Sequence, residues 1–367
     1  MKQAAVYFTD FRMKHGDNHE KKLRRLMEQA GMNTIDFKDK YVAIKIHFGE
    51  LGNLSFLRPN FARYVADYVK ELGGKPFLTD CNTLYVGTRK NALDHMDTAN
   101  LNGFNPMSTG CQVIIADGLK GTDDVEVPVV GGQLVKNAKI GRAVMDADIV
   151  ISLNHFKGHE FTGFGGALKN LGMGCGSRAG KMEMHSAGKP IVIEKRCIGC
   201  KICAKSCAHD APTFSNGKCT IDHDKCVGCG RCIGMCPKDA IRSASDETRD
   251  NLGRKIAEYS KAVVDGRPCF HINIVNNVSP CCDCHPENDA AIVGDVGMFA
   301  SFDPVALDVA CADAVNRQPV NPLSILFDRA GAADRFDSLH PTCNWRVTIE
   351  HSEAIGLGTS DYALITV

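Results

Sequence analysis

The chain has 367 residues, of which 44% are hydrophobic and 23% charged, so it can bury one large core or two smaller ones, which excludes a mainly disordered chain. Its 43 basic and 43 acidic side chains cancel, which argues against nucleic acid or an anionic membrane as a partner. No apolar run has the length of a membrane span, and the first ten residues lack the apolar segment of a signal peptide. We therefore expect a cytoplasmic protein; its oligomeric state is not predicted.

Apolar, β-rich runs alternate with helix-like segments along most of the chain. The runs expected to form buried strands lie at 41–48, 111–116, 148–153, 269–275 and 291–296. The helix-like segments lie at 17–30, 59–72, 88–98, 137–146, 246–264 and 303–316, and Asp303 and Pro304 form a cap and first turn for the last of them. This alternation predicts an α/β fold with a mostly parallel sheet and helices on both faces.

Eighteen cysteines stand out in a chain expected in a reducing compartment, where disulfides do not persist. Eight of them lie within 197–236 as two runs with two-, two- and three-residue gaps, and each cysteine of the first run recurs 29 residues later. Such an internal repeat predicts a compact inserted module at 189–239. Residues 1–188 and 240–367 then form one discontinuous α/β domain, with strands from both sides of the insertion in one sheet.

The cysteine repeat resembles the two-cluster bacterial ferredoxins, in which the last cysteine of each run ligates the other cluster. The resemblance implies two [4Fe-4S] clusters, the first held by Cys197, Cys200, Cys203 and Cys236, and the second by Cys226, Cys229, Cys232 and Cys207. A zinc ribbon or a disulfide scaffold fits less well, because zinc sites pair two cysteines with two more ligands after a longer gap. Ala208 stands where the second run has Pro237, which loosens a turn without removing a ligand.

Histidines, lysines and glycines are concentrated at 154–185, directly after the expected strand 148–153. Open α/β sheets build ligand sites at such strand ends, so we expect an anion or a cofactor here. The candidate side chains are His155, Lys157, His159, Lys169, Cys175 and His185. Gly165 and Gly166 are expected to open a helix whose amino end favours an anion. The alternative is a tight glycine-rich connection whose polar residues cap helices and face water.

The run HFKGHEFTGFGGALKNLGMGC at 155–175, with the segments 46–53, 80–85 and 295–308, is similar to the domain-of-unknown-function 362 family. The similarity spans nearly the whole chain. That family is often joined to ferredoxin modules, and it brings no established reaction with it.

A more distant resemblance is to the nickel-dependent lactate racemases, which carry a histidine, a glycine-rich run with a lysine, and a later histidine. The resemblance implies that Lys169 anchors a cofactor, His185 ligates a metal and His159 acts as an acid or base, with His95 as a weaker candidate for the partner role. The phosphate-binding motif of the racemases is missing before residue 90, and Phe164-Gly165 replaces their Phe-Ser. The resemblance therefore implies a shared architecture but not the nickel cofactor.

A third cysteine group follows the expected strand 269–275, with Cys281, Cys282, Cys284 and His285 in one proline-bracketed loop. Three thiols and an imidazole suit a soft metal or a cluster. Adjacent cysteines do not easily bind one ion together, so Cys282 and Cys284 are the candidate ligands, with Cys175 as a third. Redox-active thiols and reduced structural thiols are the alternatives.

The other cysteines have apolar neighbours and are expected to be small core residues. They are Cys81, Cys111, Cys219, Cys269, Cys311 and Cys343, of which Cys81 is the least certain because it lies at a strand end. His47 also ends a strand and is a candidate for the same cleft or for a buried structural histidine.

These features lead us to expect a redox protein in which the module passes electrons to or from a ligand or metal site on the α/β domain. A redox partner protein and a small anionic ligand are the expected partners, and oxygen-sensitive clusters suit an anaerobe. The alternatives are an electron-transfer protein without catalysis of its own and a metal or cluster delivery protein using Cys282 and Cys284. A nicotinamide-dependent enzyme is disfavoured because no strand is followed by Gly-x-Gly-x-x-Gly. Whether the chain is an oxidoreductase, and of which substrate, stays open.

Overall fold

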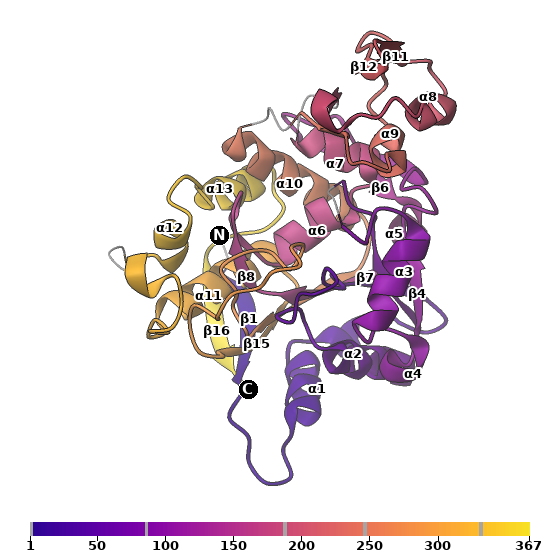
Figure 1. Ribbon diagram of the computed structural model, residues 1–367. Coiled ribbons are helices and arrows are strands. Elements are labelled where there is room, and N and C mark those ends of the chain that lie inside the picture. Colours follow the sequence, from indigo (N-terminus) through magenta and orange to yellow (C-terminus); the bar gives the residue numbers. More distant parts are fainter. Residues whose placement is uncertain (1–2, 85–86, 186–188, 245–247, 330–332) are drawn as a thin grey trace.

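The computed structural model describes residues 3–84, 87–185, 189–244, 248–329 and 333–367. An eight-stranded sheet forms its centre (Figure 1), and its strands are β1 (Ala4–Asp10), β2 (Tyr41–Lys45), β3 (Lys75–Asp80), β4 (Gln112–Ile115), β7 (Ile149–His155), β14 (Cys269–Val275), β15 (Gly297–Ser301) and β16 (Tyr362–Thr366). They lie in the order β16-β1-β15-β14-β7-β2-β3-β4. Both pairs that β15 makes are antiparallel and all other neighbours are parallel. The predicted class, α/β with a mostly parallel sheet, is confirmed.

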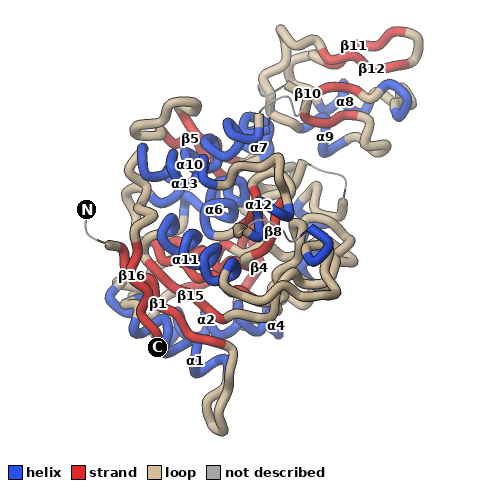
Figure 2. The backbone as a smooth tube through the Cα atoms, turned by 90° about the vertical axis from the view of Figure 1, so that its left-hand side faces the viewer, coloured by secondary structure: helices blue, strands red, loops and turns tan. Residues whose placement is uncertain are grey.

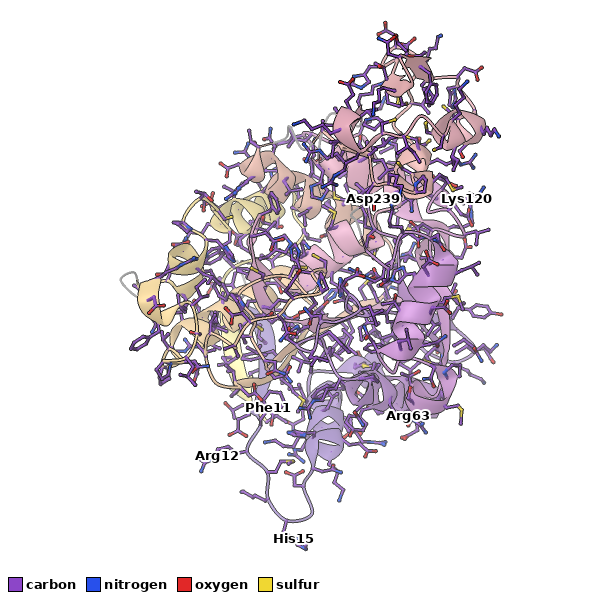
Figure 3. All side chains as sticks on the ribbon, in the orientation of Figure 1. Phe11, Arg12, His15, Arg63, Lys120 and Asp239 are labelled. Carbon is purple, nitrogen blue, oxygen red and sulfur yellow. The ribbon has the colours of Figure 1, made fainter. Side chains whose placement is uncertain are left out.

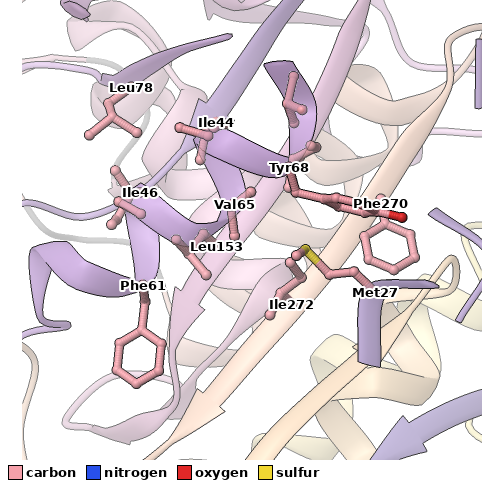
Figure 4. Close-up of a cluster of buried hydrophobic side chains, with 14 of the residues drawn as sticks. Met27, Ile44, Ile46, Phe61, Val65, Tyr68, Leu78, Leu153, Phe270 and Ile272 are labelled. Carbon is pink, nitrogen blue, oxygen red and sulfur yellow. The ribbon is translucent and has the colours of Figure 1, made fainter. Parts of the chain in front are cut away.

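Helices cover both faces of the sheet because neighbouring residues of its inner strands are apolar on both sides. Ile44 and Ile151 pack with α1 (His19–Gln29) and α2 (Pro59–Glu71) on one face (Figure 4). Ala43 and Val150, one residue earlier in the same strands, pack against helices of the other face. Such continuous apolar strands are typical of a sheet buried on both sides.

The other helices of the described part of the α/β region are α3 (Ala92–Leu101), α4 (Pro106–Thr109), α5 (Arg142–Asp146), α6 (Ala167–Cys175), α7 (Arg178–His185), α10 (Arg249–Val264), α11 (Pro304–Asn316), α12 (Arg335–Leu339) and α13 (Arg346–Ala354), with short 3₁₀ turns at Met32–Thr34 and Phe327–Arg329. Two small hairpins, β5 (Asp124–Pro128) with β6 (Asn137–Gly141) and β8 (Lys157–His159) with β9 (Gly163–Gly165), stand outside the main sheet. As expected, Asp303 caps α11, its side chain accepting from the backbone N–H groups of Val305 and Ala306.

The cysteine repeat lies in the connection between the parallel strands β7 and β14, after α6 and α7 and before α10. Its elements are β10 (Pro190–Val192), a 3₁₀ turn at Glu194–Arg196, α8 (Ile202–Ser206), β11 (Pro212–Ser215), β12 (Lys218–Ile221), α9 (Arg231–Met235) and β13 (Ile241–Ser243). β10 pairs antiparallel with β13, so the two ends of this segment lie side by side. Figures 1 and 2 show it projecting from the main body, with β11 and β12 at its far end.

Strands from both sides of the insertion meet in one sheet, because β14 pairs with β7 and β15 pairs with β1. The expected boundary at residue 188 lies outside the described residues. Asp239, labelled in Figure 3, forms an ion pair with Lys90 where the repeat meets the main body.

Two of the expected elements are wrong. The expected helix at 137–146 begins as strand β6, in which Ala138 and Ile140 are buried with a period of two, and only Arg142–Asp146 is helical. The expected strand at 291–296 is a loop apart from an isolated bridge of Val293 with Val320, and the strand is the following β15. Both segments are short apolar runs, whose periodicity does not distinguish helix, strand and buried loop.

Candidate active site

A cavity of about 470 Å³ opens at the carboxyl ends of the parallel strands β2, β3 and β7. Six of the predicted polar side chains line it together with Cys282 and Cys284, and these six are His47, His155, Lys157, His159, Lys169 and His185. They come from strand ends, the β8 hairpin, α6, α7 and the loop after β14. The expectation that the central segment and the third cysteine group face one cleft therefore holds for these residues.

Asp283, fully buried in the loop after β14, organises one side of the cavity. Its carboxylate lies 2.8 Å from Nδ1 of His155 and 3.2 Å from Nζ of Lys157. Burial opposes the charge of Asp283, but the two neighbours outweigh it and hold the pKa of this carboxyl well below its usual range. Burial likewise opposes the charge of Lys157, while Asp283 and Cys282 raise the pKa of this lysine. Lys157 is thus a cation with its own counter-ion.

His155 is held by protein groups on both sides of its ring. Its Nε2 lies 2.8 Å from the carbonyl oxygen of Asn276, and its Nδ1 faces Asp283. Both partners are acceptors, so neither ring nitrogen is available to bind a ligand. The structural interpretation, that His155 positions the loop after β14, fits better than a role in binding.

Backbone contact brings the β8 hairpin against the loop after β14. The N–H of Gly158 donates to the carbonyl of Ser279. A Cβ atom at position 158 would lie 2.2 Å from the carbonyl oxygen of Pro280, so only glycine allows this approach. Asn53 fixes the far end of the loop through a 2.9 Å hydrogen bond from its side-chain amide to the carbonyl of His285.

His159 faces Cys282 in a defined tautomer. Its Nδ1 accepts from the backbone N–H groups of Phe161 and Thr162, at 3.2 and 3.3 Å, which leaves Nε2–H as the donor toward the thiol. A hydrogen bond from Cys284 lowers the pKa of Cys282, burial opposes this, and Lys169 and His159 lower the pKa further. The hydrogen bond with Cys282 and burial raise the pKa of Cys284. Cys282 is therefore the more acidic of the two thiols, and it lies beside a cation and an imidazole N–H.

Lys169 is the cation of the cavity that is free to meet a ligand. Among the described residues it makes no hydrogen bond or ion pair, whereas Lys181 donates to the carbonyl of Gly176 and Arg89 pairs with Glu50 at 3.0 Å. His185 lies nearby, and its burial together with Lys169 lowers the pKa of this histidine to about 3. His185 is therefore neutral at physiological pH.

Of three further predicted positions, Gly166 lines the cavity and Cys175 and Gly165 do not. Cys175 is fully buried in an apolar cluster and does not line the cavity, so it is not brought to Cys282 and Cys284 as a third ligand. Gly166 precedes α6, as expected, but the amino end of this helix is occupied by the buried carboxylate of Asp308, which accepts from the N–H groups of Ala167 and Leu168. An external anion is therefore not bound there. A Cβ atom at Gly166 would lie 2.2 Å from the same carboxylate, and Gly165 does not line the cavity.

Sequence reasoning missed Glu160, whose carboxylate lies 2.7 Å from Nε2 of His285. Burial opposes its charge, but His159 and His285 hold the pKa of this carboxyl well below its usual range, and the hydrogen bond to Glu160 raises the pKa of His285. The Sγ atom of Cys284 lies within 4.8 Å of the ligand atoms of Glu160 and His285. Two loops about 125 positions apart in the sequence form this group, so no local spacing of residues predicts it.

The ferredoxin resemblance implies two sets of four cysteines in the repeat, and the four of the first set lie around one pocket. These four are Cys197, Cys200, Cys203 and Cys236. Backbone N–H groups of Cys219 and Ala240 donate to the sulfurs of Cys197 and Cys236, at 3.4 and 3.3 Å. Cys219, expected as a core residue, is buried beside this set, with its sulfur 3.6 Å from that of Cys203. Burial and the thiols of Cys229, Cys226, Cys203 and Cys207 raise the pKa of Cys232 to about 12. Cys203 belongs to the first set and the other three to the second, so both sets come near Cys232.

Comparison with known proteins gives the family of the chain. The model of a domain of unknown function, DUF362, matches residues 42–313. The chain belongs to the DUF362 family. A comparison with curated proteins finds no match. None of the helices in the described ranges has the length and apolar character needed to cross a bilayer.

Among solved structures, the lactate racemase apoprotein from Thermoanaerobacterium thermosaccharolyticum is 12% identical, with a TM-score of 0.38 over 75% of this chain and 51% of that one. A protein from Thermotoga maritima is 12% identical, with a TM-score of 0.36 over 80% of this chain and 57% of that one. The chain thus spans little more than half the length of either protein. Similarity at this level supports no argument about activity.

The segments that resemble the DUF362 family surround the cavity of this family member. His47 and Asp80 from the first two segments line it, as do several residues of 155–175. Asp308, from the last segment, caps α6 and so positions Lys169 one turn into that helix. Tyr85, in the second segment, lies outside the described residues.

Proposed function

We propose that this DUF362 protein is an iron-sulfur redox protein that passes electrons between two [4Fe-4S] clusters in residues 189–239 and a ligand in the cavity of the α/β domain. The observation that carries the proposal is that one helix, α7, contacts both the cysteine repeat and the cavity. The reaction would be an oxidation or reduction of a small anion.

The cysteines present fit the clusters on the chemistry of their surroundings. Cluster sites are made of thiolates with backbone N–H groups directed at sulfur, as Cys197 and Cys236 have here. Cys197, Cys200, Cys203 and Cys236 would hold the first cluster, and Cys226, Cys229, Cys232 and Cys207 the second. The clusters, when bound, supply or accept one electron at a time.

α7 has adjacent faces turned toward the repeat and the cavity. Arg178 and Met182, one turn apart, lie against α9, where a Cβ atom at Gly230 would meet the Arg178 side chain at 2.6 Å. Lys181 and His185, also one turn apart, line the cavity. The helix has eight residues and is about 12 Å long at 1.5 Å per residue, so a short path joins the second cysteine set and the cavity.

The cavity favours a small anion as ligand. Lys169 lines the cavity and makes no ion pair among the described residues, whereas the charge of Lys157 is balanced by Asp283. Nδ1 of His159 accepts from backbone N–H groups, so its Nε2–H is the donor that can act on a bound molecule. An external redox partner protein would dock on the repeat, where the thiol of Cys200 is exposed.

Anaerobic reconstitution followed by a potentiometric titration tests the proposal. Wild type should carry about eight iron atoms per chain and show two cluster signals, and a saturating small anion should shift the signal of the cluster nearer α7. Lys169→Ala should abolish that shift and keep the iron content, while Lys195→Ala, which changes an exposed lysine of the repeat, should change neither. A chain that binds no iron would exclude the proposal.

Two other functions predict different results. An electron-transfer protein without catalysis would show two cluster signals that no anion shifts. A metal or cluster delivery protein would transfer a labile ion to an apoprotein, and Cys282→Ser but not Cys203→Ser would abolish the transfer.

A further inference from the structure

We propose that Glu160, Cys284 and His285 form a binding site for one zinc-class divalent metal ion at the edge of the cavity. Of the metal ligands predicted from the sequence, only Cys284 belongs to this site. Glu160 and His285 take the place of Cys282 and Cys175. It adds a metal to the cavity of the proposed function, and it does not depend on the clusters.

The donor atoms are close to the arrangement that a metal needs. One ligand atom from each residue lies within 4.8 Å of the other two, and Nε2 of His285 lies 2.7 Å from a carboxylate oxygen of Glu160. Tetrahedral zinc with bonds of about 2.0 to 2.3 Å places its ligand atoms about 3.4 to 3.8 Å apart. Each pair therefore has to change by only about 1 Å.

A simple ion pair between Glu160 and His285 does not explain the whole arrangement. It accounts for one carboxylate oxygen, but the other oxygen of Glu160 is buried and has no hydrogen-bond partner among the described residues. A buried acceptor without a partner costs about 1 to 3 kcal/mol in general. A metal ion bound between Glu160, Cys284 and His285 would satisfy the carboxylate.

The donor set selects the class of metal. A thiolate, an imidazole and a carboxylate suit zinc and similar transition-metal ions, whereas magnesium and calcium prefer oxygen ligands alone. All three side chains also line the cavity. Three protein ligands leave one position of a tetrahedral ion open toward the cavity, as in catalytic rather than structural zinc sites.

The two loops that carry the ligands are held together by backbone contacts. Gly158 donates to Ser279, and the carbonyl of His285 accepts from the side chain of Asn53. The carbonyl of Glu160 accepts from the thiol of Cys343 at 3.0 Å. The ligands are thus positioned before a metal binds, which lowers the cost of ordering them.

Zinc binding to the anaerobically purified protein tests the site, measured by competition with a chromophoric chelator and by metal analysis. Wild type should bind one zinc ion per chain. Glu160→Gln, Cys284→Ser and His285→Ala should each weaken binding by roughly tenfold or more, because even residues that only support a ligand contribute a factor of 10 to 100. Cys281→Ser, the matched control for an exposed thiol of the same loop, should change it less than about twofold.

His285→Ala and Glu160→Gln remove partly exposed or isosteric groups, so a folding defect would not mask the result. Zinc binding that survives all three variants, or its absence in wild type, would overturn the inference. Iron and sulfide content is measured in the same samples: loss of zinc with full iron refutes only this site, and loss of iron with retained zinc refutes only the electron relay.

Discussion

Among single residues, the charged side chains of the cavity differ in whether a neighbouring protein group balances their charge. Lys157 and Asp283 neutralise each other, whereas Lys169 makes no ion pair with any residue that the structure describes. A hydrogen bond from Cys284 and the charge of Lys169 both lower the pKa of Cys282. Residue type alone does not separate these roles. The partner of each group decides whether it binds a ligand or supports a loop.

Cys282 should react differently from its exposed neighbour Cys281. A hydrogen bond from Cys284 lowers the pKa of Cys282, whereas the pKa of Cys281 is raised to about 11, so alkylation of Cys282 by iodoacetamide should depend less steeply on pH between 6 and 8 than alkylation of Cys281. The rate at Cys281 should rise about tenfold per pH unit, because its thiolate fraction does. Anaerobic alkylation with EDTA present, followed by peptide mass analysis, measures both rates. Equal pH dependence at the two sites would contradict the lowered pKa of Cys282.

Asp283→Asn should destabilise the protein by roughly 3 to 5 kcal/mol, because it leaves the buried cation of Lys157 without its partner. The depressed pKa of Asp283 means that its stabilisation is present above the unfolded value of about 3.9 and is lost as the pH falls further. The difference from wild type in urea unfolding should therefore be constant from pH 6 to 8. Asp289→Asn, which changes an exposed residue of the same loop, should lower the free energy of unfolding by less than about 0.5 kcal/mol. A similar loss of stability in both variants would refute the role of the buried pair.

At the scale of elements, α7 is the connection between the cysteine repeat and the cavity. The guanidinium of Arg178 is buried against α9, close enough to Asp117, Cys232 and Cys229 for their charges to act on it. Glycine is required opposite it, because a Cβ atom at Gly234 would overlap the guanidinium. One end of α7 therefore places a positive charge at the second cysteine set.

Arg178→Gln should lower the reduction potential of one of the two proposed clusters, because the positive charge that it removes favours the reduced, more negative state. We expect a shift of roughly 30 to 60 mV, which for one electron corresponds to about 0.7 to 1.4 kcal/mol. Potentiometric titration followed by electron paramagnetic resonance resolves the two clusters. Arg178→Lys keeps the charge and should shift less; equal shifts of both clusters would show that Arg178 does not act locally.

At the scale of the whole molecule, the cysteine repeat interrupts a crossover connection without interrupting the sheet. β10 and β13 pair, so residues Pro190 and Ser243 face each other where the chain leaves and returns. The helices α6 and α10 of the same crossover pack together in the α/β domain, where Leu171 and Ile256 share one apolar cluster. The core of the α/β domain thus closes without the repeat.

Replacing residues 189–239 by a short glycine and serine linker should therefore leave a folded α/β domain. We expect an unchanged circular dichroism spectrum apart from the lost segment, with a lower melting temperature, because Met182 and Leu84 lose their apolar contacts with the repeat. A shorter deletion of residues 200–230, which cuts through the repeat, should aggregate. Loss of cooperative unfolding in the first variant would show that the repeat is part of the domain core.

The sequence was enough to predict the fold class and eight of the polar and thiol side chains that line the cavity. Both predictions use local rules, namely apolar periodicity and the position of polar residues after strands. Tertiary contacts were needed to show that Asp308 fills the amino end of α6, that Cys175 is buried away from the thiol pair, and that Glu160 meets Cys284 and His285. Each of these depends on contacts between segments far apart in the chain, which no local pattern encodes.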